Sequence, residues 1–157
     1  METRLRIQGN DLVMKAVKHL NAIGALVHGS SLPDATAELV KIRASQINGC
    51  AFCLDMHTKD AAAAGETQLR LNLVATWREA TVFTEAERAA LELAEQGTRI
   101  ADHPGAVTDE AWANAAKHYD NEQLTALVTI IALINTYNRM NVITRQPGGS
   151  YTPGQFG

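Results

Sequence analysis

The sequence predicts an all-α fold. Two observations carry this prediction: apolar residues recur at intervals of three and four, and capping or helix-ending residues stand between these stretches. Alanine is abundant, as in 61–64 and 89–90, which favours closely packed helices. No segment alternates between apolar and polar residues as a half-buried strand does. The chain has 157 residues, so we expect a single domain over 1–157 with its core at about 10–145.

Three helices are expected in the first half of the chain. They span about 11–27, about 33–47, and about Cys50 to Ala64. Asn10 is a suitable N-cap for the first, and Pro33 suits the first position of the second because its fixed φ angle is that of a helix. Asn48 and Gly49 tolerate the left-handed conformation found at helix C-termini, so they separate the second helix from the third.

Four further helices are expected after the third, each marked by a polar N-cap. The caps are Thr67, Thr84 in a capping box with Glu87, Thr108, and Asp120 in a capping box with Gln123. The last helix is strongly apolar, with Leu124, Leu127 and Ile131 at helical spacing. Glycines and prolines from Pro147 onward predict an irregular, mobile tail over 146–157.

Charge and hydropathy argue against several classes of partner and cofactor. A formal net charge of −3 gives no basic surface for nucleic acid. No apolar run approaches the roughly 20 residues that span a bilayer, and the N-terminal segment lacks the apolar stretch of a signal peptide. We therefore expect a cytoplasmic protein without a membrane segment. No glycine-rich phosphate loop follows a predicted strand, so neither a nucleotide nor a flavin cofactor is expected.

The two cysteines form a CxxC motif followed by a histidine, and this group carries the functional prediction. On a helix of about 3.6 residues per turn, Cys50, Cys53 and His57 share one narrow face. Thiols one turn apart can close a disulfide, and a histidine one turn beyond Cys53 can accept its proton. In a reducing compartment, this spacing is typical of redox chemistry or of a metal site.

The position of the motif at a helix start assigns a role to each cysteine. Free backbone N–H groups and the helix dipole favour a thiolate there. Cys53 lies four residues before His57, whereas Cys50 lies two turns away from it. The spacing therefore predicts Cys53 as the attacking thiolate and Cys50 as its resolving partner.

Glu38 is a candidate to support the histidine. A buried histidine base usually needs a group that orients it and balances its charge. Only a tight turn separates the helix of Glu38 from Cys50. The same helix face also carries Lys41 and Ser45 and suits solvent, as most glutamates do. From spacing alone, both interpretations of Glu38 stay open.

Three other interpretations of the motif stay open as well. A structural zinc site needs four ligands, commonly in two separated pairs, whereas this chain has one pair of cysteines; we expect no metal. Two thiols can also be inert core residues, which the histidine on the same face argues against. A thioredoxin-type site needs a βαβ unit, which the pattern does not predict.

The run from Glu38 to His57 resembles the alkylhydroperoxidase D-like branch of the carboxymuconolactone decarboxylase family. The pattern of that branch is a Glu, then a CxxC, then a His four residues after the second Cys. All four positions match, at Glu38, Cys50, Cys53 and His57. The likeness extends over about 10–145. It includes the segments 62–67, 77–79, 84–91 and 134–139.

The resemblance implies an oxidoreductase, a thiol peroxidase or disulfide reductase, whose helical domain assembles into trimers or hexamers. It implies that Cys53 becomes a sulfenic acid, that Cys50 closes the disulfide, and that Glu38 and His57 relay the proton. The substrate is then a hydroperoxide, and the reductant is an external dithiol or a redox partner protein. Two alternatives are an adaptor that passes electrons to a partner peroxidase and a zinc-stabilised binding domain.

One position departs from the family pattern. Phe52 stands between the cysteines, where some members carry a histidine. The change makes the site more apolar, which affects substrate and reductant more than the thiol chemistry. The decarboxylase branch lacks the CxxC, so lactone decarboxylation is not expected.

Several other residues have structural interpretations. Asn135, Asn138 and Arg139 interrupt an apolar helix, and we expect them to tie helix ends and carbonyls together rather than to line a site or a subunit contact. Trp77 and Trp112 are expected to be anchors in the core or at an interface. The remaining histidines are expected at the surface. They are His19, His28, His103 and His118.

Overall fold

The computed structural model describes residues 2–7, 9–103, 105 and 107–155. Within them the chain forms seven α-helices, one short 3-10 helix and no strand, so the prediction of an all-α fold is confirmed. The α-helices are α1 (Asp11–His28), α2 (Asp34–Asn48), α3 (Ala51–Ala63), α4 (Gln68–Leu73), α5 (Glu85–Thr98), α6 (Asp109–His118) and α7 (Asn121–Thr144). The 3-10 helix, η1 (Val74–Thr76), continues α4. Residues 156–157 of the predicted tail lie outside the described residues.

The predicted caps agree closely with the observed helix starts. The side chain of Asn10 accepts a hydrogen bond from the Val13 N–H at 3.1 Å, as an N-cap does. Both predicted capping boxes are formed, Thr84 with Glu87 and Asp120 with Gln123. Pro33 differs from the prediction by one position. It is the N-cap of α2 rather than the first helical residue, because its ψ of 128° is extended.

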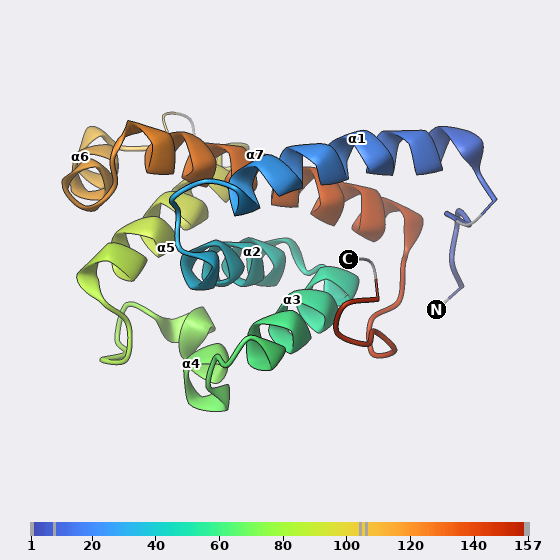
Figure 1. Ribbon diagram of the computed structural model, residues 1–157, viewed down its shortest axis with the longest axis horizontal. Coiled ribbons are helices and arrows are strands. Elements are labelled where there is room, and N and C mark those ends of the chain that lie inside the picture. Colours follow the sequence, from blue (N-terminus) through green and yellow to red (C-terminus); the bar gives the residue numbers. More distant parts are fainter. Residues whose placement is uncertain (1, 8, 104, 106, 156–157) are drawn as a thin grey trace.

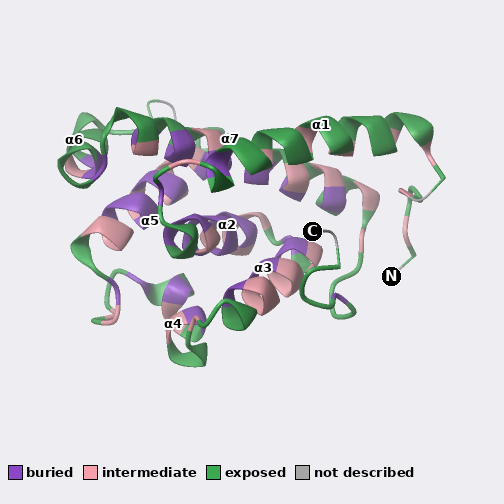
Figure 2. Ribbon diagram, in the orientation of Figure 1, coloured by how far each residue is buried: buried purple, intermediate pink, exposed green. Residues whose placement is uncertain are grey.

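α2 lies at the centre of the fold, packed against α3, α5 and α7 (Figure 1). Figure 2 shows most of this helix as buried. Its side chains Leu39, Val40 and Ile42 are among the most deeply buried, and complete burial of each contributes roughly 1.5–3 kcal/mol. Because α2 is covered on several sides, polar residues on it face other helices rather than solvent.

α7 is the longest helix and runs beside α1 and against α2 (Figure 1). Its side chains Leu127 and Ile134 are buried in the core. Among the described residues, α7 is the one helix whose length and composition would suit a membrane span. Half of that apolar window is buried inside the protein, as in a core helix.

α1 packs on α7 but leaves much of its apolar surface open. Val27 is its one buried residue, whereas Leu12 and Leu26 are 79% and 75% exposed. Figure 2 shows the exposed character of nearly the whole helix. The apolar stripe expected along 11–27 is therefore only partly covered by the described part of this chain.

The C-terminal segment is irregular, as predicted, but it is held against α3. The carboxylate of Asp55 accepts hydrogen bonds from the Gly149 N–H at 2.6 Å and the Tyr151 N–H at 2.9 Å. The Tyr151 hydroxyl donates to Asp60, and Lys59 donates to the Tyr151 carbonyl at 2.8 Å. These contacts tie the segment to α3.

Candidate active site

The CxxC motif lies at the corner between α2 and α3. Gly49 has a φ of +66°, the left-handed conformation that lets the chain leave α2 and begin α3 within two residues. Cys50 is the N-cap of α3, and its sulfur accepts a hydrogen bond from the Cys53 N–H at 3.4 Å. This geometry places both thiols at the helix start, as the sequence predicts, with Cys50 1% and Cys53 0% exposed.

The two sulfur atoms face each other and are not bonded. Both cysteines are free, and their Sγ atoms lie 2.6 Å apart. A disulfide has a length of about 2.05 Å, so the pair closes with little movement of the backbone. Ala44 and Ile134 pack around the thiols in a small apolar cluster. The site therefore suits a reversible disulfide shielded from water.

The two thiols differ in acidity. The pKa of Cys53 is lowered to about 7, and the hydrogen bond from Cys50 is the largest cause. Burial acts in the opposite direction and raises this pKa, whereas the side-chain amides of Asn141 and Asn138 lower it further. The pKa of Cys50 is raised by its hydrogen bond to Cys53, by burial and by the charge of the neighbouring thiolate. A substantial fraction of Cys53 is consequently thiolate at neutral pH, whereas Cys50 keeps its proton.

Glu38, Lys41 and His57 form a buried hydrogen-bonded group that lines the same cavity as Cys53. One carboxylate oxygen of Glu38 lies 3.1 Å from His57 Nδ1, and the other is paired with the Lys41 ammonium. Burial would raise the pKa of Glu38, but the hydrogen bond to His57 and the charge of Lys41 outweigh it and lower the pKa to about 2. Burial lowers the pKa of His57, and this effect outweighs the hydrogen bond to the Glu38 carboxylate, which raises the pKa. Glu38 is thus an anion and His57 a neutral base.

The expectation that this face of α2 suits solvent is wrong. Lys41 and Ser45 are buried, and Glu38 is largely buried. The physical reason is the central position of α2, which α3 and α7 cover. A lysine three residues after a glutamate normally signals a solvated ion pair, so nothing in the local sequence distinguishes this buried one.

A row of buried asparagines on α7 reaches the thiols. Asn135, Asn138 and Asn141 recur every three residues and all three are buried. Asn141 donates from its side-chain nitrogen to the sulfur of Cys53 at 3.3 Å. Sequence reasoning missed Asn141, although the three-residue spacing of amides along an apolar helix is a signal that could have found it.

The other asparagines of this row connect helices. Asn138 donates to the Ser45 hydroxyl at 3.0 Å and accepts from the Asn48 side chain at 2.9 Å. Asn135 donates to the Thr98 hydroxyl at 3.1 Å. The expectation that these two residues tie helices together is confirmed, whereas the expectation that Asn138 stays outside the site is not. Asn138 also influences the thiols, because its amide lowers the pKa of Cys53. Arg139 donates to the carbonyl and the side chain of Asn135.

A cavity of about 1640 Å³ opens onto the nucleophile. Cys53, His57, Glu38 and Lys41 all line it. Much of the remaining wall is apolar, from Phe52, Met56, Ile134, Tyr137 and Met140. Such a lining suits a ligand with a hydrocarbon part.

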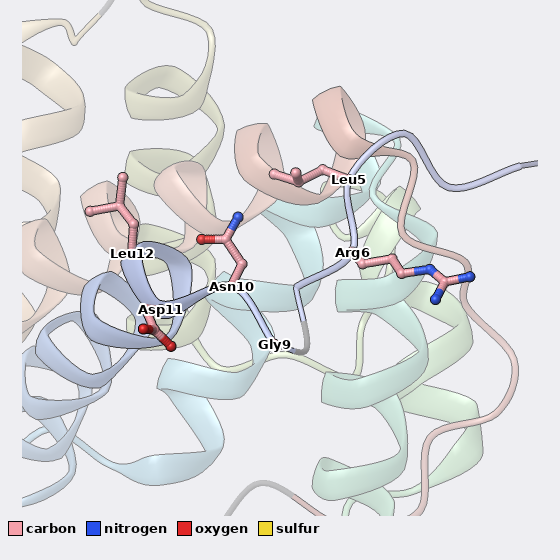
Figure 3. Close-up of a pocket in the computed structure, with 6 residues that line it drawn as sticks. All are labelled: Leu5, Arg6, Gly9, Asn10, Asp11 and Leu12. Carbon is pink, nitrogen blue, oxygen red and sulfur yellow. The ribbon is translucent and has the colours of Figure 1, made fainter.

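A second, shallower hollow of about 590 Å³ lies where the N-terminal segment meets α1 (Figure 3). It is lined by Leu5, Arg6, Gly9, Asn10, Asp11 and Leu12. Among the described residues that line this hollow there is no thiol or other nucleophile, so we consider the larger cavity as the candidate active site.

The remaining residues singled out from the sequence fall outside the site. Trp77 is in the core, as predicted, whereas Trp112 on α6 is 44% exposed and is not a core residue. The four other histidines are all exposed, as expected. Over residues 2–7, 9–103, 105 and 107–155, no group of three or more His, Cys, Asp and Glu side chains is arranged to hold a metal ion.

Comparison with known proteins places the chain in a family. A sequence model of the carboxymuconolactone decarboxylase family matches residues 12–96, more than half of the chain. This protein belongs to the carboxymuconolactone decarboxylase family. The matched region contains Glu38, both cysteines and His57.

Individual relatives agree with this assignment. The protein YdfG of Bacillus subtilis (strain 168) is 40% identical over 137 residues, which cover 87% of this chain and 92% of YdfG. A crystal structure from Agrobacterium tumefaciens, of a protein with a proposed role as the antioxidant defence protein AhpD, superposes with a TM-score of 0.86. It is 36% identical and covers 96% of this chain and 100% of its own. The fold is therefore that of the AhpD-like members of the carboxymuconolactone decarboxylase family.

More distant structures share the fold alone. A variant of the debrominase Bmp8 in complex with 2,3,4-tribromopyrrole superposes with a TM-score of 0.77 at 18% identity, over 88% of this chain and 75% of that one. Proteins described as antioxidant, as peroxidase-related and as debrominase thus have this helical arrangement.

Proposed function

We propose that this protein is a thiol peroxidase that reduces hydroperoxides by cycling Cys53 and Cys50. The observation that carries the proposal is the pair of buried sulfurs 2.6 Å apart, with the more acidic one on the wall of a large cavity. A thiolate on the wall of a substrate-sized cavity, next to a second thiol that can resolve it, is the arrangement that peroxide reduction by cysteine requires.

The first step of the proposed reaction consumes the peroxide. The Cys53 thiolate attacks the distal oxygen of R–O–OH, so that an S–O bond forms and the O–O bond breaks. Cys53 becomes a sulfenic acid, which carries the hydroxyl, and the leaving group is the alkoxide RO⁻. A proton that His57 has taken from the Cys53 thiol is returned to the alkoxide, which leaves as the alcohol ROH.

The second step forms the disulfide. The Cys50 sulfur attacks the sulfenic sulfur, an S–S bond forms, and water leaves with the Cys50 proton and the sulfenic hydroxyl. An external dithiol or a partner protein then reduces the disulfide and is itself oxidised. We propose the reducing cytosol as the compartment, because the cycle needs a steady supply of dithiol.

Glu38 and Lys41 support the base in this proposal. With Nδ1 held by the Glu38 carboxylate, proton exchange with the site falls to the Nε2 atom of His57. Lys41 balances the carboxylate, which would otherwise be an unpaired buried charge. The neutral imidazole set by this environment is the form that accepts a proton.

The test is peroxide consumption by the reduced protein with a dithiol in excess. We expect sustained turnover of an organic hydroperoxide by the wild type and none above background by Cys53→Ser. One equivalent consumed per protein, followed by turnover only when a second peroxidase is added, would support the electron-transfer adaptor instead. Stoichiometric zinc in the purified protein, with both thiols unreactive, would support the zinc-stabilised binding domain.

A further inference from the structure

Asn141, on α7, contacts the reacting sulfur of Cys53. Its side-chain nitrogen lies 3.3 Å from Cys53 Sγ, which is hydrogen-bond distance for a sulfur acceptor. The residue is buried on α7, one turn beyond Asn138. Eighty-eight residues separate it from Cys53 along the chain, so the contact depends on the packing of α7 against α3.

An amide in this position distinguishes the two protonation states of Cys53. A thiol sulfur is a weak acceptor, whereas a thiolate is charged and accepts more strongly. A donor fixed on the sulfur therefore stabilises the thiolate more than the thiol and lowers the pKa of Cys53. Because Asn141 is uncharged, it can do this in an apolar pocket without burying a second ion.

Other polar groups hold the neighbouring amide in place. Asn138 is fixed by the Ser45 hydroxyl and by Asn48. Cys50, the cap of α3, contacts the Cys53 sulfur, and the charge of Cys53 acts on Tyr137 of α7. Further titratable groups share the cavity wall with Cys53, among them His57 and Asp60 of α3 and Glu38 and Lys41 of α2.

We propose that Asn141 is a further catalytic residue, whose side-chain N–H holds the sulfur of Cys53 as a thiolate ready for attack. The consequence for peroxide reduction rests on the proposed function. The N–H···S bond itself does not, because the acidity of Cys53 can be measured without peroxide.

The experiment is a pH titration of Cys53 by alkylation. Reduced protein is treated briefly with iodoacetamide at a series of pH values, and mass spectrometry gives the alkylation rate of Cys53 separately from that of Cys50. The wild type should show an apparent pKa of about 7. Asn141→Ala should raise it by about one to two units, which slows alkylation at pH 7 by roughly fivefold or more. At alkaline pH the two rates should converge, since the thiol is then ionised in both proteins.

The matched control is Asn135→Ala. Asn135 is likewise a buried amide on α7, but its hydrogen bonds go to Thr98, Asn48, Arg139 and the Ile131 carbonyl. Its removal should leave the titration of Cys53 unchanged. An unshifted titration in folded Asn141→Ala, or an equal shift in Asn135→Ala, would overturn the proposal.

A measurement on the wild type covers the case in which Asn141→Ala does not fold. The side-chain amide signals of Asn141, followed by nuclear magnetic resonance, should shift with the ionisation of Cys53. They should also move when the disulfide forms, whereas those of Asn135 should not. Asn141 signals that do not change when Cys53 ionises would contradict the proposal. Loss of peroxide turnover with a normal response at Asn141 counts against the proposed function alone.

Discussion

His57 and Glu38 are joined through Nδ1 and a carboxylate oxygen 3.1 Å apart, although they belong to different helices. The carboxylate fixes which ring nitrogen carries the proton, so Nδ1 donates and Nε2 is left as the acceptor. Burial keeps the ring neutral by lowering its pKa. The pair is therefore in the protonation state that a base for Cys53 requires, before any substrate arrives.

Removing either member of this pair should slow the oxidation of Cys53. General-base assistance contributes about 10²–10⁴-fold to a reaction rate, so the rate of Cys53 oxidation in His57→Ala should fall by a factor in that range at neutral pH. Glu38→Gln should lose less, and the double variant little more than His57→Ala, because the residues act as a unit. Higher pH should partly rescue both variants. Stopped-flow measurements of the peroxide reaction at a series of pH values give these rates. If both single variants react at the wild-type rate at neutral pH, His57 and Glu38 have only a packing role.

The stability of the fold should fall in acid. The pKa of Glu38 is about 2 in the folded protein, against an ordinary value of 4.5. Between these values the unfolded chain binds a proton that the folded protein does not, so stability falls as the pH drops, by about 3 kcal/mol in all. The lowered pKa of His57 acts in the same direction, beginning nearer pH 6.5.

Urea unfolding at a series of pH values tests this dependence. Glu38→Gln should be less stable than wild type near neutral pH, because Lys41 loses its partner, and it should lose less stability on acidification. Glu85, whose side chain is 83% exposed, offers the control substitution Glu85→Gln, which should keep the wild-type acid dependence. Parallel curves for all three proteins would show that Glu38 is not the titrating group.

The open apolar surface of α1 predicts self-association. Leu12 and Leu26 are largely exposed, and burial between copies is the ordinary way to cover such a surface. We expect a trimer or hexamer by light scattering at micromolar concentration. The double substitution of Leu12→Glu and Leu26→Glu should shift the protein toward smaller oligomers or monomers. Leu69→Glu, which replaces an exposed leucine on α4, should leave the oligomeric state unchanged. A mass near 17.0 kDa for the wild type would contradict the expectation.

The close approach of the C-terminal segment to α3 predicts an effect at Gly148. A Cβ atom there would lie 2.4 Å from the Ala51 carbonyl oxygen, so Gly148→Ala must displace the segment. Hydrogen bonds to charged groups contribute about 1.5–3 kcal/mol, so the amides of Gly149 and Tyr151 should exchange about tenfold faster or more. Hydrogen exchange measures this directly. In the control variant Ser150→Ala, changed at an exposed position, the same two amides should exchange at the wild-type rate.

The helices and the thiol motif were predictable because their signals are local. N-caps, capping boxes and the Gly49 turn depend on neighbouring residues, and the CxxC-His spacing already predicts which side chains share a face. Asn141 was not predictable in this way, since its contact with Cys53 requires the packing of α7. The burial of Lys41 likewise follows from the position of α2 among its neighbours.

The central claim is that Cys53 meets the peroxide and Cys50 resolves it. The most direct measurement is one turnover of reduced protein with one equivalent of an organic hydroperoxide, followed by mass spectrometry of the cysteine peptides. The wild type should give an intramolecular disulfide between Cys50 and Cys53. Cys50→Ser should accumulate a sulfenic acid on Cys53 that a sulfenate reagent traps, and Cys53→Ser should give none. A sulfenic acid trapped on Cys50 in Cys53→Ser, or wild-type thiols that both stay free, would contradict the account.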